Sequence, residues 1–155
     1  MTEGTVHQLS ISSGGVPKAP VRVAVVGELG IEGDDHEDTT HHGGPERALC
    51  LWSLEVIESL QADGHGIYPG AAGENVTVAG IPWERVTPGA RLRLGEVEVE
   101  ITRPATPCWK NRRWFVDGDV SVMDHRRHPG RSRMYARVLT PGTIRPGDRV
   151  VLQVP

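Results

Sequence analysis

Cysteine is scarce in this sequence of 155 residues, which contains only Cys50 and Cys108. Cys50 lies in the apolar run 48–52, where a free cysteine usually behaves as a small buried hydrophobe. Two such residues cannot form the disulfide framework of a small secreted domain. The scarcity predicts a reducing compartment, the cytoplasm, and a structural role for Cys50.

Long apolar runs and a strong excess of one charge are also missing. No uncharged stretch is long enough to span a membrane, and residues 1–11 lack the basic and apolar parts of a secretion signal. The formal net charge of −3 argues against a general nucleic-acid-binding protein. We therefore expect neither a membrane nor a nucleic acid as partner. The locally basic stretches 110–113 and 126–133 favour a small anion instead.

Aromatic residues are few, and Phe115 is the only phenylalanine. The core must therefore use Val, Leu, Ile and Ala, which favours strands. The 19 Gly and 12 Pro residues fall between short alternating apolar segments and are typical of turns. The length fits one domain, residues 1–155. We predict a mainly β barrel or sandwich with strands at Val6–Ile11, Val21–Val26, Ala48–Trp52, Asn75–Val78, Arg91–Leu94, Val97–Thr102, Tyr135–Leu139 and Arg149–Val154.

Two local patterns add detail to this mainly β fold. The alternation in 91–94 and 97–101 gives each segment one buried face, and Leu94–Val97 predicts the hairpin between them. Ser53–Asp63 predicts one short helix with Ser53 as its N-terminal cap and Gly64 at its end. A second helical turn within Val120–Arg127 is left open.

Cys108 is the residue best placed for sulfur chemistry. It lies in the sequence Thr-Pro-Cys-Trp-Lys-Asn-Arg-Arg, directly after a predicted strand. The thiolate is the reactive form of cysteine, and Lys110, Arg112 and Arg113 would stabilise it electrostatically. We therefore predict that Cys108 serves as a metal ligand or as a sulfur carrier.

Three loops contain groups that bind ligands. His41–Arg47 combines two imidazoles, the pair Gly43 and Gly44, and a guanidinium that can bind phosphate oxygens. Ser12–Lys18 offers hydroxyls, glycines and a lysine but no Walker pattern, so taken alone it predicts a turn. Gly73–Val78 places Glu74 and Asn75 at a strand entrance, where they either contact a heterocycle or tie down their own backbone.

Other chemistries are weakly indicated. His36, Asp38, His41 and His42 form one histidine-rich group and His125 with His128 another, but no zinc-ligand spacing is present. No Gly-x-Ser-x-Gly elbow supports a serine hydrolase. A cysteine hydrolase using Cys108 with His41 or His42 as base stays open.

Five motifs in order make the chain resemble the MOSC domain, named for the C-terminal domain of molybdenum cofactor sulfurase. The resemblance extends from near residue 14 to Gly147-Asp148, and it suggests a small stand-alone member. It implies a mostly β, barrel-like fold with one or two short helices. The matching segments are Gly14-Gly15-x-x-Lys18, His42-Gly43-Gly44-Pro45-x-Arg47-Ala48, Gly73–Val78, Pro107-Cys108 and Tyr135–Leu139.

The resemblance also implies a cleft that binds the pyranopterin molybdenum cofactor. Cys108 would be the molybdenum or sulfur-handling thiol, since a soft thiolate suits this metal. The cofactor phosphate would be held by Lys18, Arg47 and Arg137, and the glycine loop with Gly43 and Gly44 would lie against the ligand. The residues expected to face the pterin are His42, Glu74 and Asn75.

Two functions follow from this resemblance. The first is a reductase of N-hydroxylated compounds that receives electrons from another protein, because the sequence has no cysteine cluster for iron–sulfur ligation. The second is a sulfur carrier that uses a Cys108 persulfide supplied by a cysteine desulfurase, with pyridoxal phosphate only on that partner. A small barrel serving as an interaction module is a third alternative. Substrate and oligomeric state are not indicated.

Overall fold

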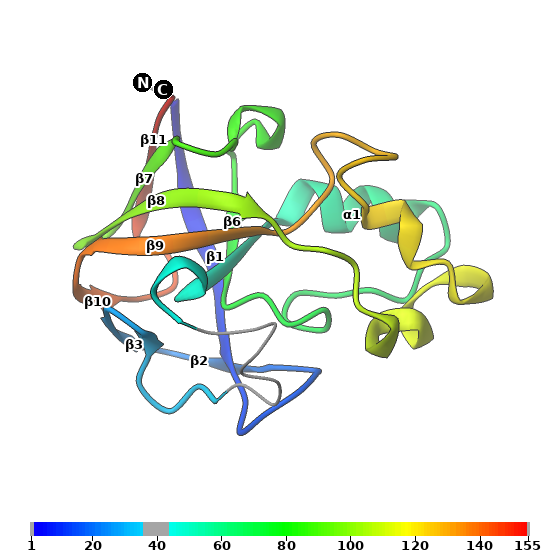
Figure 1. Ribbon diagram of the computed structural model, residues 1–155, viewed down its shortest axis with the longest axis horizontal. Coiled ribbons are helices and arrows are strands. Elements are labelled where there is room, and N and C mark those ends of the chain that lie inside the picture. The colour runs from blue at the N-terminus through cyan, green and yellow to red at the C-terminus, as the bar shows by residue number, and fades with distance from the viewer. Residues whose placement is uncertain (1, 36–43, 155) are drawn as a thin grey trace.

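The main architectural element is a closed seven-stranded β-barrel, seen in a computed structural model that describes residues 2–35 and 44–154 (Figure 1). Its strand order is β11-β7-β8-β9-β5-β6-β1, and pairing of β1 with β11 closes the ring. Closure leaves no open edge within the ring. The barrel strands are β1 (Thr2–Ile11), β5 (Leu49–Ser53), β6 (Val76–Ala79), β7 (Arg91–Leu94), β8 (Val97–Pro104), β9 (Met134–Thr140) and β11 (Arg149–Gln153).

A single α-helix among the described residues, α1 (Leu54–Ala62), connects β5 to β6. These two strands are paired in parallel, whereas the other neighbours in the ring are antiparallel. A parallel pair needs a crossover connection, and α1 provides it. Ser53 caps the helix by accepting a hydrogen bond from the Val56 N–H. Ile57 and Leu60 are fully buried, so α1 packs its apolar face into the core.

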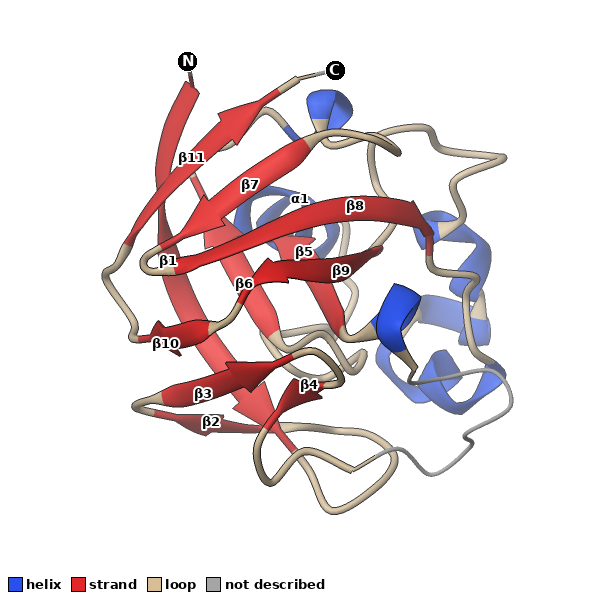
Figure 2. Cartoon of the chain, turned by 60° about the vertical axis from the view of Figure 1, so that its left-hand side comes forward, coloured by secondary structure: helices blue, strands red, loops and turns tan. Residues whose placement is uncertain are grey.

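A second, smaller sheet lies beside the barrel (Figure 2). It has the order β10-β3-β4, formed by β10 (Gly142–Ile144), β3 (Ala24–Gly27) and β4 (Gly30–Ile31). The short strand β2 (Ala19–Val21) extends the barrel sheet by pairing with the end of β1.

The barrel interior is filled by aliphatic side chains, as the low aromatic content predicts. Strand β7 alternates exposed and buried residues and β8 alternates buried and partly exposed ones over most of its length, and the hairpin between them pairs Leu94 with Val97. Gly95 has a φ of 61°, which this tight turn requires and which glycine adopts without strain. Fully buried interior residues include Leu9, Leu51, Val76, Val78, Leu92, Leu94, Val97, Val99 and Val150.

Five short 3₁₀ helices complete the described chain. The first two are η1 (Pro45–Arg47) and η2 (Trp83–Arg85). The other three, η3 (Trp109–Trp114), η4 (Val116–Gly118) and η5 (Val120–Met123), lie together on one side of the barrel (Figures 1 and 2). The open question about Val120–Arg127 therefore resolves as a 3₁₀ turn that ends at Met123. No helix among the described residues is long and apolar enough to cross a bilayer.

The predicted fold class is confirmed, and the strand predictions differ from the structure in detail. The segment predicted as one strand at Val21–Val26 is divided between β2 and β3, and β1 begins earlier than Val6. Strands β4 and β10 were not predicted, because they have only two and three residues. β4 pairs locally with β3, whereas β10 pairs with β3 across more than 100 residues of sequence. The predicted helix and the 94–97 hairpin are present.

Candidate functional site

One pocket brings together residues from six separate segments, one of which contributes only Asp35. Loop 15–18 and the turn 72–75 form two of its walls, and the segment that follows β8 forms a third. The beginning of β9 and the residues around η1 and β5 complete it. The lining residues are Gly15, Val16, Lys18, Asp35, Arg47, Cys50, Ala72, Gly73, Asn75, Cys108, Lys110, Asn111, Arg133 and Tyr135.

Cys108 occupies the N-terminal cap of η3 and lines this pocket, and its side chain is partly accessible. Lys110 lines the pocket with it. Arg112 and Arg113 do not: their guanidinium groups stack on Trp109 and Trp114, at 4.8 Å and 4.4 Å from the ring centroids. Of the three cations expected to surround the thiol, the structure places only Lys110 in the pocket.

Arg133 is a buried cation of the pocket, with 4% of the residue exposed. Its Nη1 donates to the Ala72 carbonyl at 3.0 Å, and its Nη2 donates to the Thr106 carbonyl at 3.0 Å. Carbonyl dipoles satisfy these hydrogens without cancelling the positive charge. Its Nε is buried and has no hydrogen-bond partner in the described structure. Arg133 therefore joins two pocket walls and keeps a charge that an anion can use.

Two buried indoles fix the backbone that leads into Arg133. Trp52 Nε1 donates to the Arg131 carbonyl at 2.7 Å, and Trp83 Nε1 donates to the Ser132 carbonyl at 2.7 Å. Both tryptophans belong to the core, so the site is attached directly to the barrel interior. These two hydrogen bonds hold the backbone before Arg133 in place.

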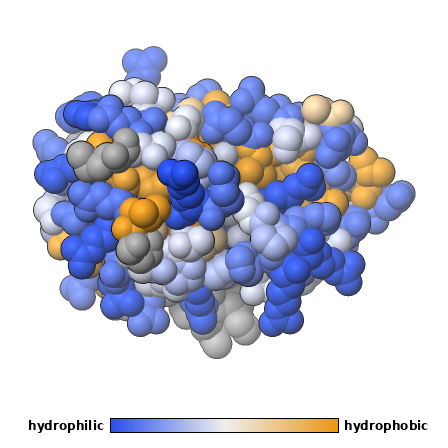
Figure 3. Space-filling view, turned by 90° about the horizontal axis from the view of Figure 1, so that it is seen from above, coloured by the Kyte–Doolittle hydropathy of each residue, from blue (hydrophilic) through white to orange (hydrophobic). Residues whose placement is uncertain are grey.

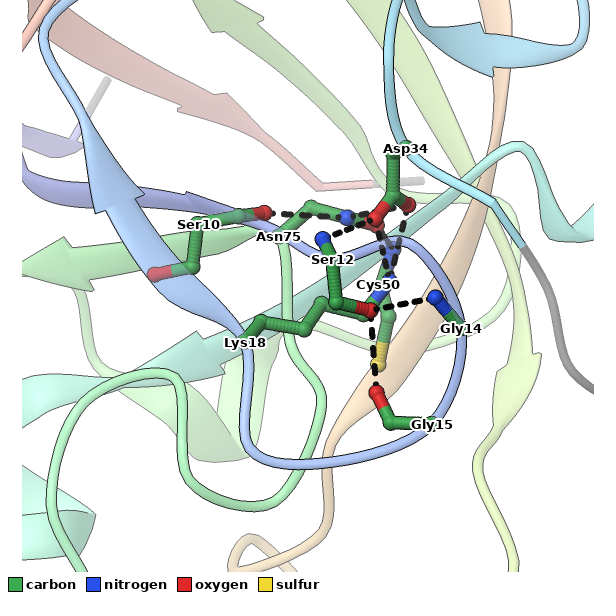
Figure 4. Close-up of polar contacts among 8 residues, drawn as sticks. All are labelled: Ser10, Ser12, Gly14, Gly15, Lys18, Asp34, Cys50 and Asn75. Carbon is green, nitrogen blue, oxygen red and sulfur yellow. Dashed lines mark hydrogen bonds and ion pairs between the residues drawn. The ribbon is translucent and has the colours of Figure 1, made fainter.

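Lys18 lines the pocket, but its charge is already paired (Figure 4). Its Nζ lies 2.7 Å and 2.8 Å from the two Asp34 oxygens. Asp34 also accepts hydrogen bonds from the Ser12 N–H and from Asn75 Nδ2. The resulting network joins the loop after β1 to the entrance of β6. It gives Lys18 a structural partner that phosphate binding would have to displace.

Asn75 stands at the pocket wall and connects three segments. Its Nδ2 donates to the Ser10 carbonyl as well as to Asp34, and its Oδ1 accepts the Cys50 N–H at 3.1 Å. Since both ends of the amide are used within the protein, Asn75 fixes the local backbone. Of the two alternatives considered for Asn75, the structure shows the one in which it ties down backbone groups, and it also places Asn75 in the pocket wall.

Cys50 and Tyr135 form the apolar part of the wall together with Ala105. Burial raises the pKa of the Cys50 thiol to about 11, so this cysteine stays protonated at neutral pH. Burial likewise raises the pKa of the Tyr135 phenol to about 12. Arg47 lies over the Tyr135 ring at 5.6 Å from its centroid, so its cation reaches the pocket across this aromatic surface.

Glu74 does not line the pocket, in contrast to the expectation that it faces a pterin. It is fully buried, and its Oε2 accepts hydrogen bonds from the Gly70 N–H and the Thr77 hydroxyl. Burial is the largest cause that raises the pKa of this carboxyl to about 7. The Glu74 side chain therefore hydrogen-bonds within its own loop, residues 70–77, where Gly70 and Thr77 provide the donors.

Arg137 also lies outside the pocket. It forms ion pairs with Glu100 at 3.3 Å and Glu46 at 3.8 Å on the barrel surface. The MOSC resemblance implied that it would hold the cofactor phosphate, but it lies farther along β9 than the pocket extends. Gly44 precedes η1, has a φ of 82° and is exposed without lining the pocket. His42 and Gly43 lie outside the described residues.

The alternative metal and hydrolase sites receive no support from the described part of the chain. Within residues 2–35 and 44–154, no group of three or more His, Cys, Asp or Glu side chains is arranged to hold a metal ion. Of the histidine-rich group, His36, Asp38, His41 and His42 lie outside the described residues, as does the histidine base considered for Cys108.

Sequence reasoning missed Arg133, Asn111 and Asp34. Asn111 is fully buried, and its Nδ2 donates to the same Ala72 carbonyl that Arg133 contacts. Its Oδ1 is buried without a hydrogen-bond partner in the described structure. Two of these residues, Arg133 and Asn111, belong to the stretch 109–134, which is rich in polar residues. The stretch has no hydrophobic periodicity, so the sequence does not indicate which of its polar side chains are buried.

Comparison with known proteins agrees with this architecture. The sequence is 33% identical over 140 residues to the uncharacterized protein YflK of Bacillus subtilis, covering 89% of this chain and 62% of that protein. It is 29% identical over 143 residues to protein YiiM of Escherichia coli, covering 84% of this chain and 61% of that protein. The chain thus spans about three fifths of the length of these curated relatives.

Solved structures share the fold. The YUAD protein of Bacillus subtilis superposes with a TM-score of 0.80 at 18% identity, over 99% of this chain and 97% of that one. YiiM of Geobacillus stearothermophilus gives a TM-score of 0.76 at 23% identity, over 97% of this chain and 75% of that one. The MOSC domain family matches residues 38–151, which include most of the barrel and of the pocket. The chain belongs to the MOSC domain family.

Proposed function

We propose that the pocket around Cys108 binds the molybdenum cofactor and that the protein reduces N-hydroxylated compounds with electrons from a partner. The MOSC family is associated with molybdenum cofactor binding in general. The observation that carries the proposal for this chain is the sharing of one pocket by the Cys108 thiol and the cations of Arg47, Lys110 and Arg133. A phosphorylated cofactor with a thiol-binding metal needs both kinds of group.

The polar groups of the pocket fit this cofactor. Arg133 Nε is a buried donor and Asn111 Oδ1 a buried acceptor, and both lack a partner in the described structure. Leaving such groups unpaired is costly, so a ligand with matching acceptors and donors is favoured. A pterin has ring nitrogens, an amino group and a carbonyl that meet this need. Of the sequence-based choice of Lys18, Arg47 and Arg137, only Arg47 is kept, and Lys110 would hold the phosphate with it.

Different residues of the pocket would ligate the metal, orient the cofactor and exclude water. Cys108 would provide the thiolate ligand, and the carbonyl-bridged Arg133 would orient the group beside it. Cys50 and Tyr135, both protonated at neutral pH, would form a wall without competing charge. The bound cofactor would supply the two-electron chemistry needed to remove oxygen from nitrogen.

Electron delivery falls to a partner protein in this proposal. The two cysteines of the sequence, Cys50 and Cys108, are both free thiols and are too few to ligate an iron–sulfur cluster, which generally needs four ligands. Free thiols also agree with the expected cytoplasmic location.

A second candidate is the sulfur-carrier function. It is favoured by the partial accessibility of Cys108, since a persulfide must be reached by a desulfurase that loads it and by an acceptor that unloads it. Lys110 would stabilise the anionic persulfide in the same pocket. Pyridoxal phosphate would be needed only on the desulfurase.

Metal analysis by mass spectrometry together with pterin fluorescence tests both candidates. Protein would be produced in cells that make the cofactor, as wild type, Cys108→Ser and Cys50→Ser. Molybdenum and pterin at about one per chain, with the molybdenum lost only in Cys108→Ser, is the expected result. A Cys108 persulfide without pterin would reject the reductase in favour of the sulfur carrier, and equal losses in both variants would reject Cys108 as the special thiol.

A further inference from the structure

The charge of the chain is divided unevenly. Residues 109–133 contain seven Lys and Arg against three Asp and Glu, a formal net charge of +4. The rest of the chain contains ten against seventeen, a formal net charge of −7. The basic segment begins directly after Cys108 and includes η3, η4 and η5, which lie together beside the barrel (Figure 1). The pocket thus opens next to a positive surface in an otherwise acidic protein.

Aromatic groups are exposed on this same surface. Trp109 has 63% of its area exposed and Tyr68 has 40%, although the chain has few aromatic residues. Val116 is also exposed, at 50%. Figure 3 keeps the right-hand side of Figure 1 on the right and shows apolar residues among strongly hydrophilic ones at that end. Tryptophan, tyrosine and arginine are the residue types that dominate binding at protein interfaces.

The exposed side chains are held in place before any partner binds. Arg112 stacks on Trp109, and Arg113 stacks on Trp114 and donates to the Val16 carbonyl at 3.0 Å. Tyr68 packs edge-on against Trp114, with ring centroids 5.1 Å apart. Interface side chains that are already ordered lose less conformational entropy on association. We name Trp109, Arg112, Arg113, Trp114 and Tyr68 the basic aromatic face.

We propose that the basic aromatic face is the docking surface for an acidic electron-carrier protein of the flavodoxin type. This inference rests on the proposed reductase function, which requires an external donor. The face adjoins the pocket, because Trp109 lies between the pocket residues Cys108 and Lys110 in the sequence. A carrier bound there would bring its redox group close to the reacting centre.

Charge complementarity selects an acidic protein over a nucleic acid. A long polyanion would extend beyond the face and meet the rest of the chain, whose formal net charge is −7. A small acidic protein needs only a local contact, and electron-transfer encounters are among the smallest protein interfaces. Such an encounter is steered by charge and weakens as salt screens it.

Titration calorimetry and fluorescence anisotropy with a labelled acidic flavodoxin test the proposal on the full chain. The charge-reversal variant is Arg112→Glu with Arg113→Glu. Its matched control is Arg93→Glu with Arg145→Glu, which makes the same change in net charge at exposed residues of β7 and the turn after β10. Trp109→Ala tests the aromatic contribution. Unfolding midpoints of all variants would establish that each one folds.

The wild type should bind the flavodoxin at low salt and lose about tenfold or more in affinity at physiological salt. The charge reversal should weaken binding at least tenfold, Trp109→Ala should weaken it several-fold, and the matched control should leave it within about twofold of wild type. Molybdenum content should be equal in all four proteins.

Three results would overturn the proposal: no binding of the flavodoxin, equal losses in the charge reversal and its control, or tighter binding of a single-stranded oligonucleotide. Self-association through the same face, detected by light scattering and abolished by the charge reversal, would also reject the acidic electron carrier as the partner. Binding does not require the cofactor, so these failures are distinct from loss of molybdenum in the wild type, which would reject the reductase function instead.

Discussion

Lys18 and Asp34 form a buried ion pair at the edge of the pocket, with 2.7 Å between Nζ and Oδ1 and side-chain exposures of 8% and 2%. Asp34 also receives hydrogen bonds from Ser12 and Asn75, so one carboxylate holds three segments together. The presence of Lys18 in a motif that suggests phosphate binding therefore has a structural explanation within the protein itself. This lysine neutralises an aspartate that the motif does not include.

The ion pair predicts a strong loss of stability when one partner is removed. Asp34→Ala leaves a buried ammonium without its counter-charge and should lower the free energy of unfolding by about 3–5 kcal/mol. Lys18→Met with Asp34→Ala should recover part of this loss, because no isolated charge is left. Urea unfolding of the single and double variants measures both effects.

The exposed pair Arg91–Glu98, at 3.8 Å, provides the control for that experiment. Glu98→Ala should cost less than about 1 kcal/mol, since solvent screens the pair. A similar cost for Asp34→Ala and Glu98→Ala would show that the Lys18–Asp34 pair contributes no more than a surface contact.

Glu74 predicts a pH dependence of stability. Its pKa is raised from 4.5 to about 7 by burial, so the folded state holds this proton more tightly than the unfolded state. The stabilising contribution is present below pH 4.5, decreases as pH rises and is lost above about pH 7. The difference amounts to about 3 kcal/mol as an upper estimate. Urea unfolding of wild type and Glu74→Gln at matched pH values isolates the contribution of Glu74 to the free energy of unfolding.

The amide of Glu74→Gln cannot ionise, so this variant should gain stability relative to wild type as pH rises from about 5 to 8. Other titrating groups are common to both proteins and cancel in the comparison. A constant difference over this range would indicate that Glu74 ionises near its usual pH in the folded protein.

The two thiols should react at different rates. Cys108 is partly accessible, whereas Cys50 is buried with a pKa raised to about 11 by desolvation. Iodoacetamide near neutral pH should therefore modify one thiol per chain rapidly, and peptide mass spectrometry should locate it at Cys108. Cys108→Ser should remove the fast phase and Cys50→Ser should leave it. Fast labelling of Cys50 would contradict the burial described here.

The barrel was largely predictable, because its strands alternate on a period that sequence alone displays. The segments 91–94 and 97–101 predict β7 and β8, and the structure contains both with the expected hairpin. The Ser53 cap likewise predicts the beginning of α1. The division of Val21–Val26 between two sheets was not predictable, since the partners of β3 are the short strands β4 and β10, which have no periodicity of their own.

The site was less predictable, because burial of its polar groups depends on distant partners. Arg133 becomes a pocket residue through carbonyls of Ala72 and Thr106 and through two indoles that fix the preceding backbone. No local pattern encodes these contacts. Cys108 and Arg47 could be selected from the sequence, since their motifs place reactive groups beside turns, whereas Glu74 was assigned to the pocket although its own loop buries it.

Arg47 and Arg137 test whether the motif or the position in the structure determines which arginine binds the anion. Both were expected to hold the cofactor phosphate, but only Arg47 lines the pocket, and Arg137 pairs with Glu100 and Glu46 on the surface. Arg47→Gln should therefore lower the pterin content of purified protein about tenfold or more, because one charge-assisted contact is lost. Arg137→Gln should leave it unchanged and cost less than about 1 kcal/mol of stability, since its ion pairs are exposed.

Pterin fluorescence of the two variants, produced side by side and normalised to protein, measures this difference. The substitutions are chemically identical, so a general effect of removing one arginine would lower both contents equally. Equal loss would place Arg137 in the binding surface of the loaded protein and would show that the pocket extends along β9 beyond Tyr135. Loss in Arg47→Gln alone would support the phosphate position proposed beside Lys110, since these two cations line the same pocket.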